Sequence, residues 1–302
     1  MNEMQQKIID LKKKKDALIL AHFYQTPDIQ EIADHVCDSF EMARRAFDAK
    51  QELLIICGVH FMAESAKLLN PDKTVLIPKP DAGCPMADMI TPEDVLKLRK
   101  KHPDAAVVCY VNSTAAVKAV SDICCTSSSA EQIVRALPQN QIIFIPDRNL
   151  GAYISSIITE KDFIFHEGWC PVHDCISVDD VSAANKKHPG AKLLVHPECR
   201  GDVLALADFV GSTAQIIKYA LESPEDEFII GTEYGVVEYI KKLASGKSFY
   251  PLTDSFECED MKKTLLSDVL ISLETGKYEM TLRGIEVDGA KRSLERMVHG
   301  NL

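Results

Sequence analysis

One sequence pattern occurs three times along the chain, and this repetition limits the possible folds more than any other feature. The segment around His22 aligns with the segments around Tyr110 and His196, at steps of 88 and then 86 residues. A second aligned series keeps the same steps and has a hydroxyl in each copy, at Ser39, Ser127 and Thr213. Self-similarity over a fixed period indicates an architecture of equivalent units. We therefore expect three small units that share one centre.

Each copy also ends on a cysteine. Cys84, Cys170 and Cys258 are separated by 86 and then 88 residues. We place the units at residues 1–88, 89–175 and 176–302, and the last unit includes an insertion and a closing helix. Residues from about 263 to 286 have no counterpart in the other copies. We expect them to begin with a helix and to pack across the third unit.

Within each copy, short apolar runs alternate with amphipathic segments, as in a parallel sheet covered by helices. The runs are rich in Val, Ile and Leu without alternation, as expected for strands buried on both faces. The predicted strands are residues 17–21, 36–38, 53–57 and 74–77, then 106–110, 123–126, 142–145 and 163–165, then 192–195, 209–211, 228–231 and 249–251. Helices are predicted over 91–101, 178–187 and 288–298. The expected fold class is α/β, with three pseudo-threefold-related α/β/α sandwich units, each with a short parallel sheet, around a central active site.

Charge and composition exclude several classes of protein. The 302 residues carry a formal net charge of −11, which disfavours nucleic acid as a partner. The basic run from Lys12 to Lys15 lies where an N-terminal helix is predicted to end, and the helix dipole stabilises cations there. No run of about 18 apolar residues is present, so we expect no membrane-spanning helix. The N-terminus lacks the layout of a signal peptide, so the ten cysteines are expected to be reduced thiols in the cytoplasm.

The three aligned cysteines are candidate metal ligands. None of them belongs to a C-x-x-C pair, which argues against a zinc ribbon or a two-cluster ferredoxin arrangement. Three thiolates can hold a zinc ion with one open position, or a four-iron cluster with one free iron. A free iron is a Lewis acid that can bind a hydroxyl or a carboxylate and ease the loss of water. The alternative is that the cysteines coincide because the repeated units share an ancestor.

Polar residues follow the first predicted strand of each copy. They are His22 and Tyr24, Tyr110 and Asn112, and His196 and Glu198. Open α/β sheets bind ligands outside the carboxyl ends of their strands, so three such edges facing one axis make a single site. Glu198 is the candidate general base, because a carboxylate in a dry cleft can have its pKa raised toward neutrality. His173, three residues beyond Cys170, is either a partner of the metal centre or a loop residue.

Hydroxyls at predicted helix starts are a further candidate element of the site. Ser39, Ser127, Ser212 and Thr213 each follow a short predicted strand and begin a helix. Each alone is an ordinary N-cap. Helix N-termini also bind anions through their free N–H groups, so the set predicts a pocket for a phosphate or a dicarboxylate.

The chain also carries an ordered series of longer motifs. They are Ala21-His22-Phe23-Tyr24-Gln25, Gly58-Val59-His60-Phe61-Met62-Ala63-Glu64, Ala82-Gly83-Cys84, Cys109-Tyr110-Val111-Asn112-Ser113, Pro146-Asp147-Arg148-Asn149-Leu150-Gly151, His196-Pro197-Glu198-Cys199, Gly211-Ser212-Thr213 and Cys258-x-x-Met261-Lys262. This series resembles the quinolinate synthase family, the iron–sulfur enzymes of NAD biosynthesis, over essentially the whole chain. Many longer members of that family have a C-x-x-C-x-x-C stretch near the C-terminus. The chain has only Cys258 there, so it resembles the short form.

The resemblance implies three α/β/α units around a pseudo-threefold axis, and one [4Fe–4S] cluster bound by Cys84, Cys170 and Cys258. It implies condensation of iminoaspartate with dihydroxyacetone phosphate to give quinolinate, with loss of phosphate and water. Catalysis is assigned chiefly to Tyr24 and Glu198. Substrate contacts fall on His22, Ser39, Tyr24, Tyr110, Asn112, Ser127, His196 and Thr213. An aspartate-oxidising enzyme that supplies iminoaspartate is an expected partner.

The sequence leaves two other functions open. One is a different [4Fe–4S] hydro-lyase that acts on a hydroxy acid. The other is a non-enzymatic iron–sulfur sensor of redox state or oxygen, for which no basic helix-turn-helix or appended output domain is evident. A zinc hydrolase would differ from all of these in being colourless and indifferent to oxygen.

Overall fold

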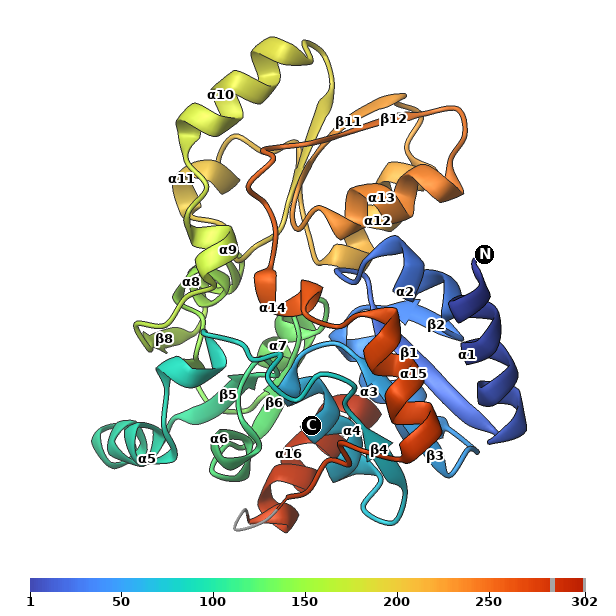
Figure 1. Ribbon diagram of the computed structural model, residues 1–302. Helices are drawn as coiled ribbons and strands as arrows, with labels where there is room; N and C mark the ends of the chain where they lie inside the picture. The colour runs from blue at the N-terminus through green and yellow to red at the C-terminus, as the bar shows by residue number, and fades with distance from the viewer. Residues whose placement is uncertain (283–285, 301–302) are drawn as a thin grey trace.

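The computed structural model of the protein describes residues 1–282 and 286–300 (Figure 1). Its strands form three sheets of four parallel strands each. The first sheet contains β1 (Ala17–His22), β2 (His35–Cys37), β3 (Leu53–Cys57) and β4 (Thr74–Leu76), the second contains β5 (Ala106–Tyr110), β6 (Ile123–Cys125), β7 (Gln141–Ile145) and β8 (Asp162–Phe165), and the third contains β9 (Lys192–Val195), β10 (Phe209–Val210), β11 (Glu227–Gly231) and β12 (Ser248–Pro251). All the predicted strands are present, with bounds that differ by at most one residue.

Helices flank each of the three sheets. In chain order they are α1 (Glu3–Lys14), α2 (Pro27–Ile32), α3 (Ser39–Asp48), α4 (His60–Leu69), the 3₁₀ turn η1 (Ala87–Met89), α5 (Pro92–Lys101), α6 (Ala115–Ala119), α7 (Ala130–Ala136), α8 (Arg148–Ile157), α9 (Pro171–Asp174), α10 (Val178–Lys187), α11 (Gly201–Leu204), α12 (Thr213–Glu222), α13 (Gly235–Leu243), α14 (Glu259–Lys262), α15 (Leu266–Thr275) and α16 (Val287–His299). The α/β fold of three units is therefore confirmed, and so are the three helices predicted at 91–101, 178–187 and 288–298. No helix in the described ranges is both long and apolar enough to span a bilayer.

All three sheets have the same strand order. The orders are β2-β1-β3-β4, β6-β5-β7-β8 and β10-β9-β11-β12. The first and third strands of each unit are thus the central pair. The second strand lies on one side of the first strand, and the third strand lies on its other side. Ligands bind at such a switch point, outside the carboxyl ends of the central strands. Each unit therefore presents one crevice, and the residues after its first and third strands border that crevice.

One aspartate contact recurs in every unit. Asp34, Asp122 and Asp208 stand immediately before the second strand of their unit, at the repeat steps of 88 and 86. Each carboxylate accepts a hydrogen bond from a backbone N–H of the neighbouring first strand. The donors are Ile19, Val107 and Leu193, at 2.8, 2.7 and 2.8 Å. The sequence repeat is therefore also a repeat of local hydrogen bonding.

The segment after Cys258 does not pack where the sequence predicted. The expected helix is present as α15, but Leu266, Val269 and Leu273 of this helix pack with Ile8 and Ile19 of the first unit. Figure 1 shows α15 beside α1. The third sheet has no free face, because α12 and α13 cover one side and α10 and α11 cover the other. The prediction that this insertion packs across the third unit was wrong.

The end of the chain returns further to the first two units. Backbone hydrogen bonds join Met280 to Val75 at 2.8 Å and Ile77 to Tyr278 at 3.0 Å, so this segment lies along the edge of β4. The last helix, α16, packs against α6, β6 and α4. Both of these contacts tie residues beyond Cys258 to the first and second units.

Candidate active site

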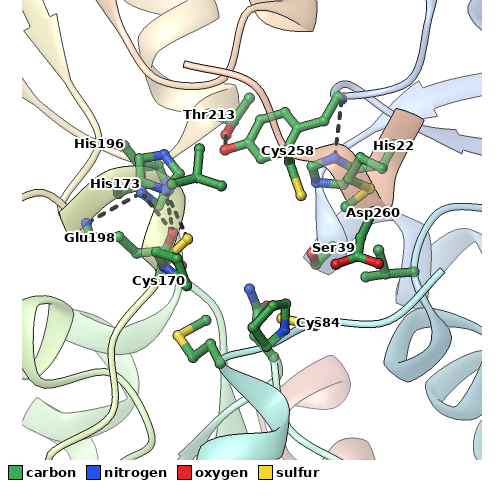
Figure 2. A pocket seen from close by; sticks show the side chains of 18 of the residues that line it. His22, Ser39, Cys84, Cys170, His173, His196, Glu198, Thr213, Cys258 and Asp260 are labelled. Atoms are coloured by element: carbon green, nitrogen blue, oxygen red, sulfur yellow. Dashed lines mark hydrogen bonds and ion pairs between the residues drawn. The ribbon is translucent and has the colours of Figure 1, made fainter. Parts of the chain in front are cut away.

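A cavity of about 320 Å³ lies where the three units meet (Figure 2). Its wall contains all twelve residues to which the family resemblance assigned a role as metal ligand, substrate contact or catalytic group, whereas Ser212, also suggested for the anion pocket, does not line it. They reach it from the carboxyl ends of β1, β5 and β9, from the starts of helices and from the three cysteine loops. The described part of the chain therefore brings these residues together from all three units.

The three cysteines share one local geometry. Cys170 and Cys258 are the residues that precede α9 and α14, and Cys84 lies three residues before η1. In each case the sulfur accepts a hydrogen bond from the backbone N–H of the third residue along the chain. The donors are Ala87, His173 and Met261. Backbone N–H groups of Met86 and Asp260 act in the same way on Cys84 and Cys258, and such N–H groups favour the thiolate form.

Burial opposes ionisation of these thiols in the absence of a partner cation. Burial raises the pKa of Cys84 to about 12 and that of Cys258 to about 11, and it raises the pKa of Cys170 as well. The charge of Cys258 contributes to the rise at Cys84, and the charge of Cys84 contributes to the rise at Cys170, so the three groups are close enough to interact. A bound metal centre supplies the positive charge that makes three buried thiolates favourable.

The three thiols do not form a compact site for a single metal ion among the described residues. Among the described residues, the donor atoms of Cys170, His173 and Glu198 all lie within 4.8 Å of one another, and the three cysteines do not form such a group. A zinc ion bound by three thiolates at about 2.3 Å needs sulfurs roughly 3.8 Å apart. In a four-iron cluster each cysteine binds a different iron, so the sulfurs stand farther apart. The arrangement therefore argues against one zinc ion bound by all three cysteines, and three thiols are the kind of donor that an iron–sulfur cluster uses.

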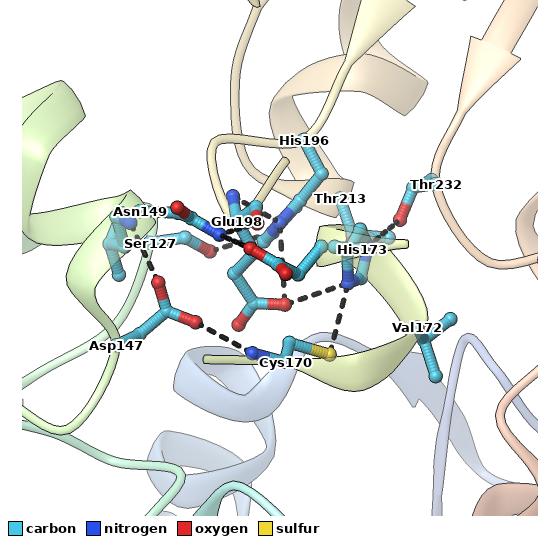
Figure 3. A network of polar contacts seen from close by, with 12 residues as sticks. Ser127, Asp147, Asn149, Cys170, Val172, His173, His196, Glu198, Thr213 and Thr232 are labelled. Atoms are coloured by element: carbon cyan, nitrogen blue, oxygen red, sulfur yellow. Dashed lines mark hydrogen bonds and ion pairs between the residues drawn. The ribbon is translucent and has the colours of Figure 1, made fainter. Parts of the chain in front are cut away.

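A chain of hydrogen bonds connects Glu198 to Tyr24. Glu198 Oε2 lies 2.9 Å from His173 Nδ1, and His173 Nε2 lies 3.1 Å from Thr232 Oγ1 (Figure 3). Thr232 Oγ1 is in turn 2.9 Å from the hydroxyl of Tyr24. These groups come from the loop after β9, from α9, from the end of β11 and from the end of β1. The two residues suggested as catalytic are therefore joined by a path along which protons can shift.

The electrostatics of Glu198 differ from the prediction. Burial alone would raise its pKa, but contact with His173 and His196 lowers the pKa of Glu198 to about 2. Burial also lowers the pKa of His196 to about 3, so His196 is neutral near pH 7 and its charge does not act on Glu198 there. Contact with His173, through its charge first and its hydrogen bond second, is therefore the main reason that Glu198 stays ionised. The expectation of a pKa raised toward neutrality was wrong, because it considered desolvation and not the histidine contact.

His22 and His196 have the same local arrangement. The backbone N–H of Tyr24 donates to His22 Nδ1 at 3.2 Å, and the backbone N–H of Glu198 donates to His196 Nδ1 at 3.3 Å. Burial, followed by the charges of Lys262 and His196, lowers the pKa of His22 to about 3. Both rings are therefore neutral with the proton on Nε2, and at His196 this proton faces Ser127 Oγ at 3.3 Å. Each ring can donate a hydrogen bond to an anion.

The hydroxyls at helix starts do not all serve as caps. The side chain of Asp38 caps α3, and Ser39 is the first residue of that helix. Ser212 caps α12 together with Gln215, and Thr213 comes next. Ser127 precedes Ser129, the residue that flanks α7. The prediction that Ser39, Ser127 and Thr213 are N-caps was therefore wrong, and their hydroxyls are not used by the helix ends beside them.

Two acceptors in the cavity wall have no partner within the described ranges. They are Glu198 Oε1 and Asn112 Oδ1, and both are buried. A buried acceptor without a hydrogen bond costs about 1–3 kcal/mol. Such groups in a polar cavity indicate where a ligand supplies donors.

Sequence reasoning missed Thr232 as a member of this site. The positions that the repeat makes equivalent to it are Gly58 and Pro146, which carry no hydroxyl. Its place directly after β11 was the only available signal. The sequence suggested His173 only as a neighbour of Cys170, and its Nδ1 does lie 3.3 Å from Cys170 Sγ. The contact between His173 and Glu198 was not predicted.

The fold and the cavity define a triplicated α/β enzyme whose central site combines cysteines, histidines and a buried carboxylate. The family model described as "Quinolinate synthetase A protein" matches residues 6–299. Two proteins named quinolinate synthase, from Caldicellulosiruptor bescii and Methanoregula boonei, are each 50% identical over 295 residues, covering 98% of this chain and 97% of those proteins. Another of that name, from Clostridium kluyveri, is 50% identical over 288 residues and 95% of both chains. The chain belongs to the quinolinate synthase family.

Proposed function

We propose that the chain condenses iminoaspartate with dihydroxyacetone phosphate to form quinolinate, with loss of phosphate and water. In this proposal Cys84, Cys170 and Cys258 bind one [4Fe–4S] cluster. The observation that carries the proposal is the presence, in one cavity, of three thiols and of the hydrogen-bonded path from Glu198 to Tyr24. When bound, the cluster supplies a Lewis acid that eases the departure of a hydroxyl group.

Both proposed substrates are anions, and the cavity offers neutral donors to hold them. His22 and His196 carry Nε2 protons, and Ser39, Ser127 and Thr213 carry hydroxyls that their helices leave unused. Hydrogen bonds from neutral donors and helix starts can bind carboxylates and phosphate without a fixed cation. We assign Tyr110 and Asn112 to the same role, because both line the cavity and the Asn112 carbonyl oxygen has no partner among the described residues.

Proton transfer runs along the path between Tyr24 and Glu198. Burial, followed by the charge of Glu198, raises the pKa of Tyr24 well above its usual value, so its phenol stays protonated and acts as a donor to the reacting oxygen. Thr232 and His173 then return a proton to Tyr24 by shifts along hydrogen bonds of 2.9 and 3.1 Å. Glu198 stays ionised and orients the His173 ring through the 2.9 Å contact with Nδ1, as the carboxylate of a catalytic triad does.

The proposal extends to the source of iminoaspartate and to the place where the enzyme acts. Iminoaspartate is an imine that water hydrolyses, so we assign an aspartate-oxidising enzyme as its source. The reduced state of the thiols fits the cytoplasm as the place of action.

The test is anaerobic purification, followed by a visible spectrum, iron and sulfide assays, and measurement of quinolinate formed from the two substrates. We expect a brown protein that bleaches in air and makes quinolinate. A colourless protein with stoichiometric zinc would contradict the proposal. Dehydration of a hydroxy acid without quinolinate formation would instead favour the alternative function, a different [4Fe–4S] hydro-lyase.

Removing the hydroxyl of Thr232 is expected to interrupt proton transfer while the shape of the site is kept. In Thr232→Val the path between Tyr24 and His173 loses its middle member, and we expect kcat to fall by about 10²-fold with KM nearly unchanged. Thr264→Val is the matched control, because Thr264 is fully buried outside the cavity wall and its hydroxyl has no hydrogen-bond partner in the described part of the chain. Steady-state rates that fall equally in both variants would contradict this role for Thr232.

A further inference from the structure

Two fully buried acids lie behind the cysteine loops at equivalent places. Asp147 follows β7 and Glu233 follows β11, and they are 86 residues apart, which is the step between the second and third units. Asp147 Oδ2 accepts a hydrogen bond from the backbone N–H of Cys170 at 3.2 Å (Figure 3). Glu233 Oε1 accepts one from the backbone N–H of Cys258 at 3.4 Å. Two units thus make the same contact with acids of different length.

The first unit makes the corresponding contact in another way. Its equivalent position is Val59, 88 residues before Asp147, which has no carboxylate. Asp260 of α14 takes this place, and its Oδ1 accepts a hydrogen bond from the backbone N–H of Gly83 at 3.1 Å, next to Cys84. Each of the three cysteine loops is therefore held by one carboxylate, which bonds to a backbone N–H at the cysteine or beside it.

Further contacts fix the orientation of each carboxylate. Asp147 Oδ1 accepts from the N–H of Leu150 at 2.7 Å and so caps α8. Glu233 accepts from the N–H of Gly235 at 2.7 Å, and Lys262 Nζ lies 2.7 Å from its other oxygen. Lys263 Nζ lies 2.7 Å from Asp260 Oδ1. The carboxylates are therefore fixed points and not mobile side chains.

Two of these acids use both of their carboxylate oxygens. Asp147 accepts from Cys170 through Oδ2 and from Leu150 through Oδ1, and Glu233 accepts from Cys258 through Oε1 and from Gly235 through Oε2. An amide side chain offers one acceptor oxygen, whereas a carboxylate offers two oxygens that point in different directions.

We infer that Asp147, Glu233 and Asp260 are positioning residues, which hold the three cysteine loops so that their sulfurs face the cavity before a metal centre binds. The carboxylate fixes the backbone at one end of each loop, and the N–H of the third residue fixes the sulfur at the other. The inference rests on the proposed role of the cysteines as ligands. Substitution of residues that hold metal ligands in place typically lowers metal affinity by about 10–100-fold.

The test uses Asp147→Asn, Glu233→Gln and Asp260→Asn in the full chain. In metal-free protein, the alkylation rate of each cysteine by iodoacetamide is followed by mass spectrometry. We expect alkylation to become about 10-fold faster at the partner cysteine, because a loop that has lost its carboxylate contact exposes its sulfur more often. The partners are Cys170 for Asp147→Asn, Cys258 for Glu233→Gln and Cys84 for Asp260→Asn, and the last variant also removes a charge that acts on Cys258. The side chain of Asp260 is 18% exposed, so we expect Asp260→Asn to destabilise the fold least of the three variants. This variant still tests the inference if the other two do not fold.

Iron retention gives a second readout. After anaerobic reconstitution, release of iron to a chelator is expected to be about 10–100-fold faster in the three variants than in the unaltered protein. Asp208→Asn is the matched control, because it removes the same kind of bond to the N–H of Leu193 away from the cavity. It should lower Tm and leave all cysteine rates unchanged.

The outcomes separate the inference from the proposed function. Equal changes at all three cysteines, or no change at any, would overturn the positioning role. If the unaltered protein takes up no iron and sulfide but the pairwise alkylation pattern holds, the cluster proposal fails and the holding of the loops by these acids stands.

Discussion

Replacing Glu198 by glutamine is expected to lower kcat by about 10³-fold and to leave the iron and sulfide content unchanged. Glutamine keeps the size of the side chain but lacks the negative charge that faces His173 Nδ1 across 2.9 Å. The Glu198 side chain is also almost fully buried, so water cannot replace the lost charge. Rates of quinolinate formation and metal assays on the same anaerobic samples measure both quantities.

The control for this variant is Glu160→Gln, which removes a charge from an exposed pair with Arg135 at 3.0 Å. Its rate should match that of the unaltered protein, because exposed ion pairs contribute little. The pKa of Glu198, lowered to about 2, means that this group is ionised throughout the range from pH 6 to pH 8. The rate of the unaltered protein should therefore show no inflection from Glu198 in that range. Normal turnover by Glu198→Gln would remove Glu198 from the proton path.

Much of the fold could be predicted because each strand occurs three times in the repeat, so its pattern could be compared between copies. The buried strands have continuous apolar runs, and β1 and β5 are buried at every position, which explains why their bounds were visible in the sequence. The polar residues after β1, β5 and β9 stood out against these runs. Their arrival at one cavity follows from the shared strand order.

Two of the three errors share one physical cause, which is contact between distant parts of the chain, and the third is local. α15 lies on the first unit because both faces of the third sheet are already covered, and no local pattern records that. The pKa of Glu198 depends on His173, which lies 25 residues earlier in the chain. At the start of α3, adjacent Asp38 and Ser39 are both good capping residues, and only the backbone geometry selects Asp38.

Replacing Cys258 by serine is expected to abolish quinolinate formation to below about 10⁻³ of the original rate and to remove the visible absorbance. A serine hydroxyl is a harder and far weaker ligand for iron than a thiolate, so the cluster would keep only two of its three protein ligands. Cys175→Ser is the decisive comparison, because Cys175 also lines the cavity but belongs to none of the aligned series. It is exposed, its sulfur donates to the carbonyl oxygen of Val172 at 3.3 Å, and its loss should leave iron, sulfide and rate unchanged. If Cys175→Ser lost the cluster and Cys258→Ser retained it, the ligands would not follow the threefold repeat, and the assignment of one thiol to each unit would have to be abandoned.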